Sequence, residues 1–155
     1  MTDQDEQNLW VIRTDFTDSE KWTAVRDLIA APQPDGFGME FYAYVEYKDD
    51  PHYSGMNVSK LVQSLPDDYP GFVCFVVDAT TINDDEYPIL VVDFSPDSMD
   101  LEDDQQTPEQ IPFKTFRAVP ATIQSIENNL SIANMDFEDF ADSVDPDGVF
   151  RGFPE

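Results

Sequence analysis

Two apolar runs near the middle of the chain constrain its fold more than any other feature. GFVCFVVDA, at 71–79, is apolar on both faces of an extended strand, and ILVVDF follows at 89–94. A strand of that kind lies inside a sheet that is covered on both sides. The linker between the runs, TTINDDEYP, suits a hairpin better than a parallel crossover, which takes about a dozen residues or more. We therefore expect an antiparallel pair of strands, with the first of them central in the sheet.

The remaining elements are predicted from periodicity and from end signals. A first helix starts at the capping box TDSE, in which Thr17 precedes Glu20 by three positions. Its apolar face consists of four side chains at helical spacing, namely Trp22, Val25, Leu28 and Ile29. Further expected elements are strands at 8–16, 41–47 and 113–119, and helices at about 57–65, at about 122–134 and from 136 onward.

This order, β-α-β-α-β-β-β-α-α, predicts an α/β or α+β fold. We expect one globular domain over 8–155, with a mixed sheet of about five strands and three to four helices. Residues 1–7 are predicted to be a loose acidic tail, and 95–110 an exposed acidic loop without apolar periodicity.

The net charge of −25 restricts the partners that the chain can bind, since 33 acidic residues stand against 8 basic ones. Such a surface repels nucleic-acid phosphates and anionic lipids, so we expect neither direct nucleic-acid binding nor membrane binding. It attracts basic proteins and speeds their encounter. Solubility and adaptation to high salt are alternative reasons for an acidic surface, and that interpretation stays open.

Cysteine and histidine usage gives little support to nucleophilic or transition-metal chemistry. Cys74 is the single cysteine, so no internal disulfide can form, and its apolar surroundings predict a buried, inert thiol. His52 is the single histidine and lies in a polar segment. No GxSxG motif is present, and we expect no cofactor and no complete catalytic set. The acidic N-terminus and the lack of a long apolar stretch predict a cytoplasmic protein.

The segment DPDG near the C-terminus invites comparison with a calcium-binding loop. If Gly148 takes position 6 of such a loop, Asp145 and Asp147 take positions 3 and 5, as required. Position 1 is then Ser143 and position 12 is Pro154, so two essential carboxylates are missing. We therefore expect a tight turn here rather than a metal site.

Three aspartates, Asp15, Asp78 and Asp93, each end an apolar strand. Carboxylates at strand ends form magnesium pockets in several enzyme folds, because hard cations take oxygen ligands. The expected hairpin puts Asp78 and Asp93 at opposite edges, which leaves Asp15 and Asp78 as the pair that can meet. The favoured interpretation is that these acids start turns and helices, and a ligand pocket is the alternative.

The stretch ENNLSIANMDFEDFADSV contains the other candidate residues. One helix face is predicted to pack on the core, and it consists of Phe137, Phe140, Ala141 and Val144. Glu138, Asp139 and Asp142 then point outward. In the preceding helix Asn134 falls beside the apolar stripe, where it either caps the helix or faces a polar pocket with Glu127 and Asn128.

Three blocks, VIRTDFTD, FVVDATT and ENNLSIANMDFEDFADSVDPDGVFRGF, resemble a family of small bacterial and fungal domains of unknown function. The resemblance implies a stand-alone domain or a module. It implies no activity, so no catalytic residue is carried over from it.

Taken together, the residues favour a non-catalytic acidic protein that binds a basic protein surface, as inhibitors, immunity proteins and nucleic-acid mimics do. The candidate partner-binding acids are Asp100, Glu102, Asp103, Asp104, Glu138, Asp139 and Asp142. The first alternative is an enzyme or small-ligand-binding domain, possibly magnesium-dependent, that uses Asp15, Asp78 and the Glu127–Asn134 region. The second alternative is an ordinary domain with a salt-adapted surface.

Overall fold

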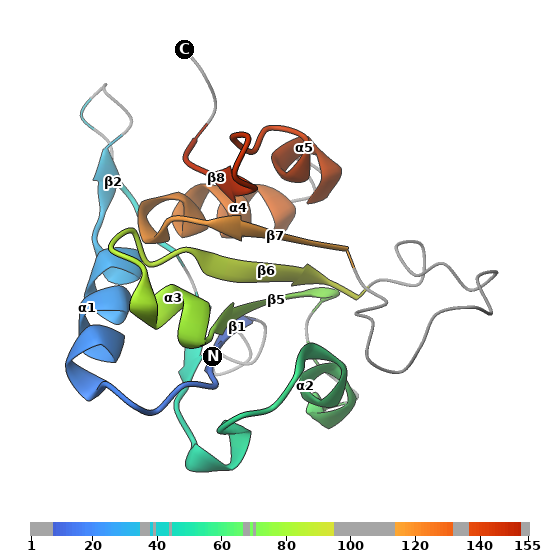
Figure 1. Cartoon of the computed structure of the whole chain (residues 1–155). Helices are drawn as coiled ribbons and strands as arrows, with labels where there is room; N and C mark the ends of the chain where they lie inside the picture. Colours follow the sequence, from blue (N-terminus) through green and yellow to red (C-terminus); the bar gives the residue numbers. More distant parts are fainter. Residues whose placement is uncertain are drawn as a thin grey trace, which may run out of the picture.

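The main sheet of the protein has six strands in the order β4-β1-β5-β6-β7-β8. A computed structural model describes residues 8–34, 38, 40–43, 45–66, 69, 71–94, 114–131 and 137–152. The strands of this sheet are β1 (Leu9–Arg13), β4 (Val45–Lys48), β5 (Val73–Val77), β6 (Ile89–Asp93), β7 (Lys114–Ala118) and β8 (Val149–Phe150). Figure 1 shows β5, β6 and β7 stacked one above the other through the middle of the molecule.

The predicted hairpin at the centre of the sheet is confirmed. β5 and β6 are antiparallel, with Cys74 opposite Val92 and Val76 opposite Leu90, and every residue of both strands is buried. β1 runs parallel to β4 and to β5, while β7 is antiparallel to β6 and parallel to β8. The mixed α/β class predicted from the sequence is therefore confirmed.

Helices cover both faces of this sheet. They are α1 (Ser19–Ala30), α2 (Val58–Ser64), α3 (Ala79–Asn83), α4 (Ile123–Ser131) and α5 (Phe137–Ala141), with 3₁₀ turns η2 (Pro51–Tyr53) and η3 (Pro120–Thr122). The larger apolar cluster joins one face of the sheet to α1, α4 and α5, through side chains such as Phe75, Val25 and Ile126. The smaller cluster joins the opposite face to α2 through Val58 and Leu61.

Some element boundaries differ from the sequence prediction. The segment expected as one strand at 41–47 is divided between β3 (Glu40–Phe41), which pairs with β2 (Gln33–Pro34), and β4, which pairs with β1. The predicted linker between the hairpin strands contains the short helix α3. β8 was not predicted, because two residues are too few to show the period-2 alternation of a strand.

The start of α1 is also different from the prediction. Its N-cap is Asp18, whose carboxylate accepts from the Lys21 amide at 3.1 Å, whereas Thr17 donates its hydroxyl hydrogen to Asp15. Hydrogen bonds to an ionised acceptor are the stronger ones, which favours the aspartate. Leu28 is 45% exposed rather than buried, because it lies about 100° around the helix from the buried Ile29.

Helix α5 provides a test of this packing. Its Phe140 is fully buried and meets Phe150 edge-on, at 5.4 Å between ring centroids. We expect Phe140→Ala to lower the free energy of unfolding by about 3–5 kcal/mol, since the deletion leaves a cavity. Urea unfolding followed by circular dichroism measures the change. The control is Asp139→Ala on the same helix, whose exposed side chain predicts an effect within about 0.5 kcal/mol. Equal stability of the two variants would contradict the packing described here.

Candidate functional site

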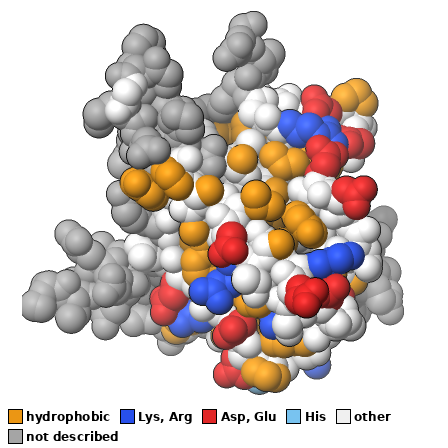
Figure 2. All heavy atoms as spheres, turned by 90° about the vertical axis from the view of Figure 1, so that its left-hand side faces the viewer, with side chains coloured by type: hydrophobic (Ala, Val, Ile, Leu, Met, Phe, Trp, Pro, Cys, Tyr) orange, Lys and Arg blue, Asp and Glu red, His pale blue; other side chains and the backbone are white. Residues whose placement is uncertain are grey.

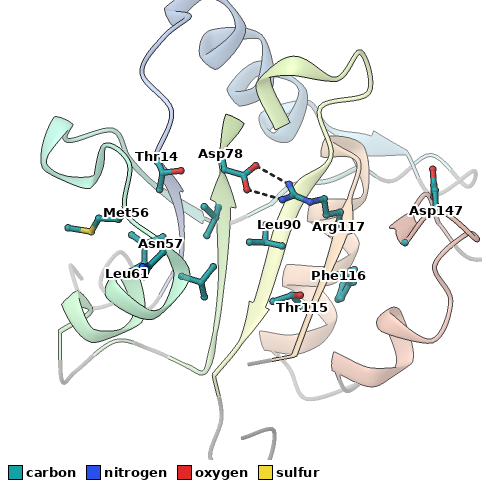
Figure 3. Close-up of a pocket in the computed structure, with 13 residues that line it drawn as sticks. Thr14, Met56, Asn57, Leu61, Asp78, Leu90, Thr115, Phe116, Arg117 and Asp147 are labelled. Carbon is teal, nitrogen blue, oxygen red and sulfur yellow. Dashed lines mark hydrogen bonds and ion pairs between the residues drawn. The ribbon is translucent and has the colours of Figure 1, made fainter. Parts of the chain in front are cut away.

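A groove of about 500 Å³ opens on the sheet face that carries α2. Its floor includes Val76 and Leu90, and one wall is formed by α2 and the residues before it, Met56 and Asn57. The opposite wall comes from β7 and from the turn before β8. Figure 3 shows Asp78 and Arg117 meeting across the floor, with Leu61 and Met56 on the side of α2.

The polar centre of the groove is the ion pair between Asp78 and Arg117. Asp78 follows the last residue of β5, and Arg117 stands on β7, two strands away. Arg117 lies opposite Leu90 of β6, so its side chain reaches across that strand. Nη1 donates to Asp78 Oδ1 at 3.0 Å and Nη2 to Oδ2 at 2.8 Å, which makes the pair bidentate.

Asp78 also starts helix α3. Its Oδ1 accepts from the Thr81 amide at 3.1 Å, as an N-cap residue does, and it lies 3.0 Å from the Thr81 hydroxyl. The same hydroxyl is 2.8 Å from the Pro88 carbonyl oxygen, to which Arg117 Nη1 also donates. Burial alone would raise the pKa of Asp78, but the hydrogen bonds and charge of Arg117, with those of Thr81, hold that pKa below its ordinary value.

The side chains around Asp78 are poorly suited to acid–base catalysis. A carboxylate that caps a helix and holds a bidentate arginine is a poor general base, because its charge is already stabilised. In the described part of the chain, no group of three or more His, Cys, Asp or Glu side chains could hold a metal ion. Cys74 is fully buried, and burial raises the pKa of its thiol to about 12. The groove is better suited to hydrogen bonding with a polar ligand than to catalysis.

The three strand-end aspartates lie in different environments. β1 and β5 are parallel, so Asp15 and Asp78 follow strands that end at the same edge of the sheet. Asp15 accepts from the amide and hydroxyl of Thr17, in a local turn, and does not line the groove. Asp93 is buried at the opposite end of the hairpin, where it pairs in register with Lys114. Both Asp15 and Asp78 therefore have the turn and cap roles that the sequence favoured.

The candidate residues of helix α4 lie away from this groove. Glu127 is 4% exposed, and its Oε1 accepts from Asn128 Nδ2 at 2.7 Å. The same Nδ2 is 3.0 Å from the Tyr42 carbonyl oxygen, which links α4 to the segment after β3. α4 packs on the larger cluster, on the other face of the sheet from the groove. The structure thus separates Glu127 and Asn128 from Asp78, while Asn134 lies outside the described residues.

The predicted turn at DPDG is confirmed. The Gly148 amide donates to the Asp145 carbonyl oxygen at 2.8 Å, and Gly148 has a φ of +84°, which glycine adopts without strain. The turn has a partner that sequence analysis did not predict. Arg151 donates to Asp145 at 2.6 Å, to Asp147 at 2.7 Å and to both oxygens of Glu86 at 2.8 Å.

The predicted partner-binding acids are only partly described. Asp139 and Asp142 are exposed on and after α5. Glu138 belongs to the same helix, and nothing further is described of its side chain. Asp100, Glu102, Asp103 and Asp104 lie outside the described residues, as do the acidic tail and the loop at 95–110.

Sequence analysis missed two arginines, Arg117 in the groove and Arg151 beside the DPDG turn. Arg117 stands between Phe116 and Ala118, two buried residues of the same strand. Strand alternation therefore directs Arg117 to the opposite face, which is the one signal that could have placed it in a groove. For Arg151, its position four residues after Asp147 is a signal that could have suggested a contact with the turn, but nothing in the sequence points to Glu86.

The chain matches a domain family of unknown function, DUF6924, over residues 8–153, and it belongs to that family. Comparison with curated proteins and with solved structures gave no significant match. Across the described residues, every helix is too short or too polar to serve as a membrane span.

The ion pair in the groove predicts a pH-dependent contribution to stability. We expect Asp78→Asn to lower the free energy of unfolding at pH 7 by about 1–3 kcal/mol, because Arg117 and α3 lose a charged acceptor. The lowered pKa of Asp78 means that its stabilisation is fully present above the unfolded-state pKa, about 3.9. It is lost as the pH falls through the lower folded-state value. The difference between wild type and variant should therefore shrink below about pH 4.

Urea unfolding across this pH range is the measurement. The control is Asp85→Asn, a neutralisation of an exposed acid just after α3. A difference between Asp78→Asn and wild type that stays constant down to pH values near 2 would contradict the assigned ion pair.

Proposed function

We propose that this protein is a non-catalytic acidic interaction protein of the cytoplasm that binds a basic surface of a partner protein. The observation that carries the proposal is the use of the few basic side chains within the fold. Several basic residues contact polar groups, acids or aromatic rings of the same molecule, namely Arg13, Arg26, Lys48, Arg117 and Arg151. Three of them, Lys48, Arg117 and Arg151, are paired with acids within the fold.

The acidic side chains are distributed differently. Those with exposed positions in the described chain are Glu20, Asp27, Asp49, Asp50, Asp84, Asp85, Glu86, Asp139, Asp142, Asp145 and Asp147. Figure 2 shows acidic side chains in several separate groups on the face that it presents, with apolar side chains between them. A net charge of −25 spread in this way attracts cations from many directions. This spread of negative charge supports electrostatic steering of a basic partner. A specific complex also needs a docking element on the acidic protein.

The acidic run from Asp100 to Asp104 is the densest local source of negative charge, with four acids in five residues. We assign it the role of electrostatic docking strip, with Asp139 and Asp142 as a secondary contribution. Inhibitors, immunity proteins and nucleic-acid mimics have this combination of small size, acidic surface and no catalytic set.

The docking strip gives a testable difference between two equally charged variants. We expect D100N/E102Q/D103N/D104N to lose most of its capture of basic proteins from a cell extract at about 50 mM NaCl. The dispersed control E20Q/D27N/D49N/D85N removes the same number of charges from exposed positions and should retain most of the capture. Quantitative mass spectrometry of the retained proteins, before and after a wash at about 500 mM NaCl, measures both effects.

Three outcomes count against this proposal. Retention of no basic protein at either salt concentration would reject partner binding. If both variants lose capture of basic proteins equally, the docking strip is rejected, and binding depends only on the overall negative charge. Unfolding of the isolated protein at low salt, reversed by molar salt without a partner, would favour the salt-adapted alternative.

The groove beside Asp78 favours one second candidate, a small-ligand-binding domain. The supporting observation is that a strand-end carboxylate and Arg117 both line a groove of about 500 Å³. A small polar ligand that binds there should shift the amide NMR signals of Thr14, Asn57 and Asp78 together, whereas millimolar MgCl₂ should not, because Arg117 and Thr81 already hold the Asp78 carboxylate. Shifts spread over the surface acids, or none at the groove, would count against this candidate.

A further inference from the structure

A second groove, lined by apolar and aromatic side chains, lies beside the end of the central hairpin. Its volume is about 530 Å³, and we call it the aromatic groove. The lining side chains are Val62, Leu65, Pro66, Tyr69, Phe72 and Phe94. They come from the end of α2, from the segment that leads into β5, and from the residue after β6. Among the described residues that line the groove, none has a charged side chain, in contrast to the composition of the chain as a whole.

The groove has a rigid wall because Tyr69 is fixed at its hydroxyl. The Trp10 amide donates to this hydroxyl at 2.9 Å, and the hydroxyl donates to the Val73 carbonyl oxygen at 2.7 Å. The Tyr69 ring also meets Trp10 edge-on, at 5.3 Å between centroids. Burial raises the pKa of Tyr69, so the phenol stays neutral and keeps both bonds. The ring is thus pre-organised before any ligand arrives.

The rest of the wall is equally ordered. Phe94 lies 5.8 Å from Tyr69 and 6.1 Å from Phe72 between ring centroids, and its amide donates to the Phe72 carbonyl oxygen at 2.8 Å. Next to Phe72 in the sequence, a Cβ at Gly71 would come within 3.2 Å of the Leu9 side chain, which would have to shift to make room.

Phe72 is more exposed than its size and position in the fold require. Its 55% exposure is the largest among the exposed large hydrophobic residues of the described chain, above Leu28 at 45% and Tyr42 at 43%. An exposed ring that meets a second ring edge-on in a rigid apolar groove is typical of the anchor positions in protein interfaces, where aromatic residues dominate the binding energy.

The charge of the adjoining sequence indicates which partner fits. Two aspartates, Asp67 and Asp68, stand between the lining residues Pro66 and Tyr69. The segment 95–113, which follows Phe94, contains six acidic residues and no lysine or arginine. An apolar groove in a chain with this excess of acids, two of them directly beside lining residues in the sequence, is complementary to an apolar side chain with basic neighbours. A second copy of the protein fits poorly, because each copy carries a net charge of −25.

We propose that the aromatic groove is the docking site for a basic amphipathic segment of a partner protein, and that it receives one large aliphatic or aromatic side chain of that segment. This inference rests on the proposed function, because it supplies the specific contact that a diffuse acidic field lacks. The groove contributes the apolar anchor, and the net charge of −25 contributes steering and salt dependence.

The test uses fluorescence anisotropy with a short labelled peptide of lysines and leucines, arranged so that the leucines fall on one helix face. A matched peptide has the same lysines with serine in place of every leucine. We expect the leucine peptide to bind wild type at least about tenfold more tightly than the serine peptide. Phe72→Ser should weaken the leucine peptide by about tenfold and leave the serine peptide unchanged. Leu28→Ser, an equivalent change at an exposed position on α1, should behave as wild type.

Circular dichroism and thermal unfolding confirm that both variants are folded, as the exposure of both side chains predicts. The two peptides could instead bind equally, with binding weakened by salt but unaffected by Phe72→Ser. That result would overturn the aromatic groove as the docking site and leave the acidic interaction function in place. No binding of either peptide at about 50 mM NaCl would overturn both. A wild-type dimer that Phe72→Ser dissociates would overturn the proposal in favour of a second copy as the occupant.

Discussion

The structure depends on the burial of β5 on both of its faces. Each residue of this strand is buried, so its two sets of alternating side chains each require a covering layer. Phe75 and its neighbours on one face are covered by α1, α4 and α5, and Cys74 and Val76 on the other face by α2. The two layers are unequal, since α2 has seven residues and α1 alone has twelve. Both grooves occur on the side that the shorter helix covers.

Asp78 shows how an acidic residue acts structurally in a highly acidic chain. A single carboxylate ends β5, starts α3 and holds Arg117 of β7, so that three elements meet at one side chain. Arg151 has the complementary role, because one guanidinium gathers acids from the DPDG turn and from the loop after α3. Both arginines thus hold acids at points where the backbone changes direction, while most acids of the described part of the chain are exposed to solvent.

The central elements could be predicted from the sequence because their signals are local. The hairpin followed from two unbroken apolar runs and a short linker, and the helix expected at about 57–65 is α2, at Val58–Ser64. The short elements β2, α3 and β8 escaped prediction, and β3 was not separated from β4, since elements of two to five residues have too few positions to show a period. Their formation depends on partners far away in the sequence.

The candidate sites were harder to predict for the same physical reason. Asp78 was identified by its position after an apolar strand, but its partner Arg117 is 39 residues away. The aromatic groove joins Tyr69 and Phe94 through contacts that no spacing rule indicates. The calcium alternative at DPDG could be rejected early, because the ligand positions of such a loop are fixed by sequence alone.

The placement of the two tryptophans gives the protein a built-in pair of optical reporters. Trp22 is 3% exposed within the larger cluster, flanked by Arg13 and Arg26, so its emission reports on the α1 layer. Trp10 packs against the smaller cluster and touches Tyr69, one wall of the aromatic groove. Single-tryptophan variants would therefore separate the spectroscopic response of the two sides of the sheet. Binding of a peptide in the aromatic groove could then be followed in solution through Trp10 emission, without an attached label.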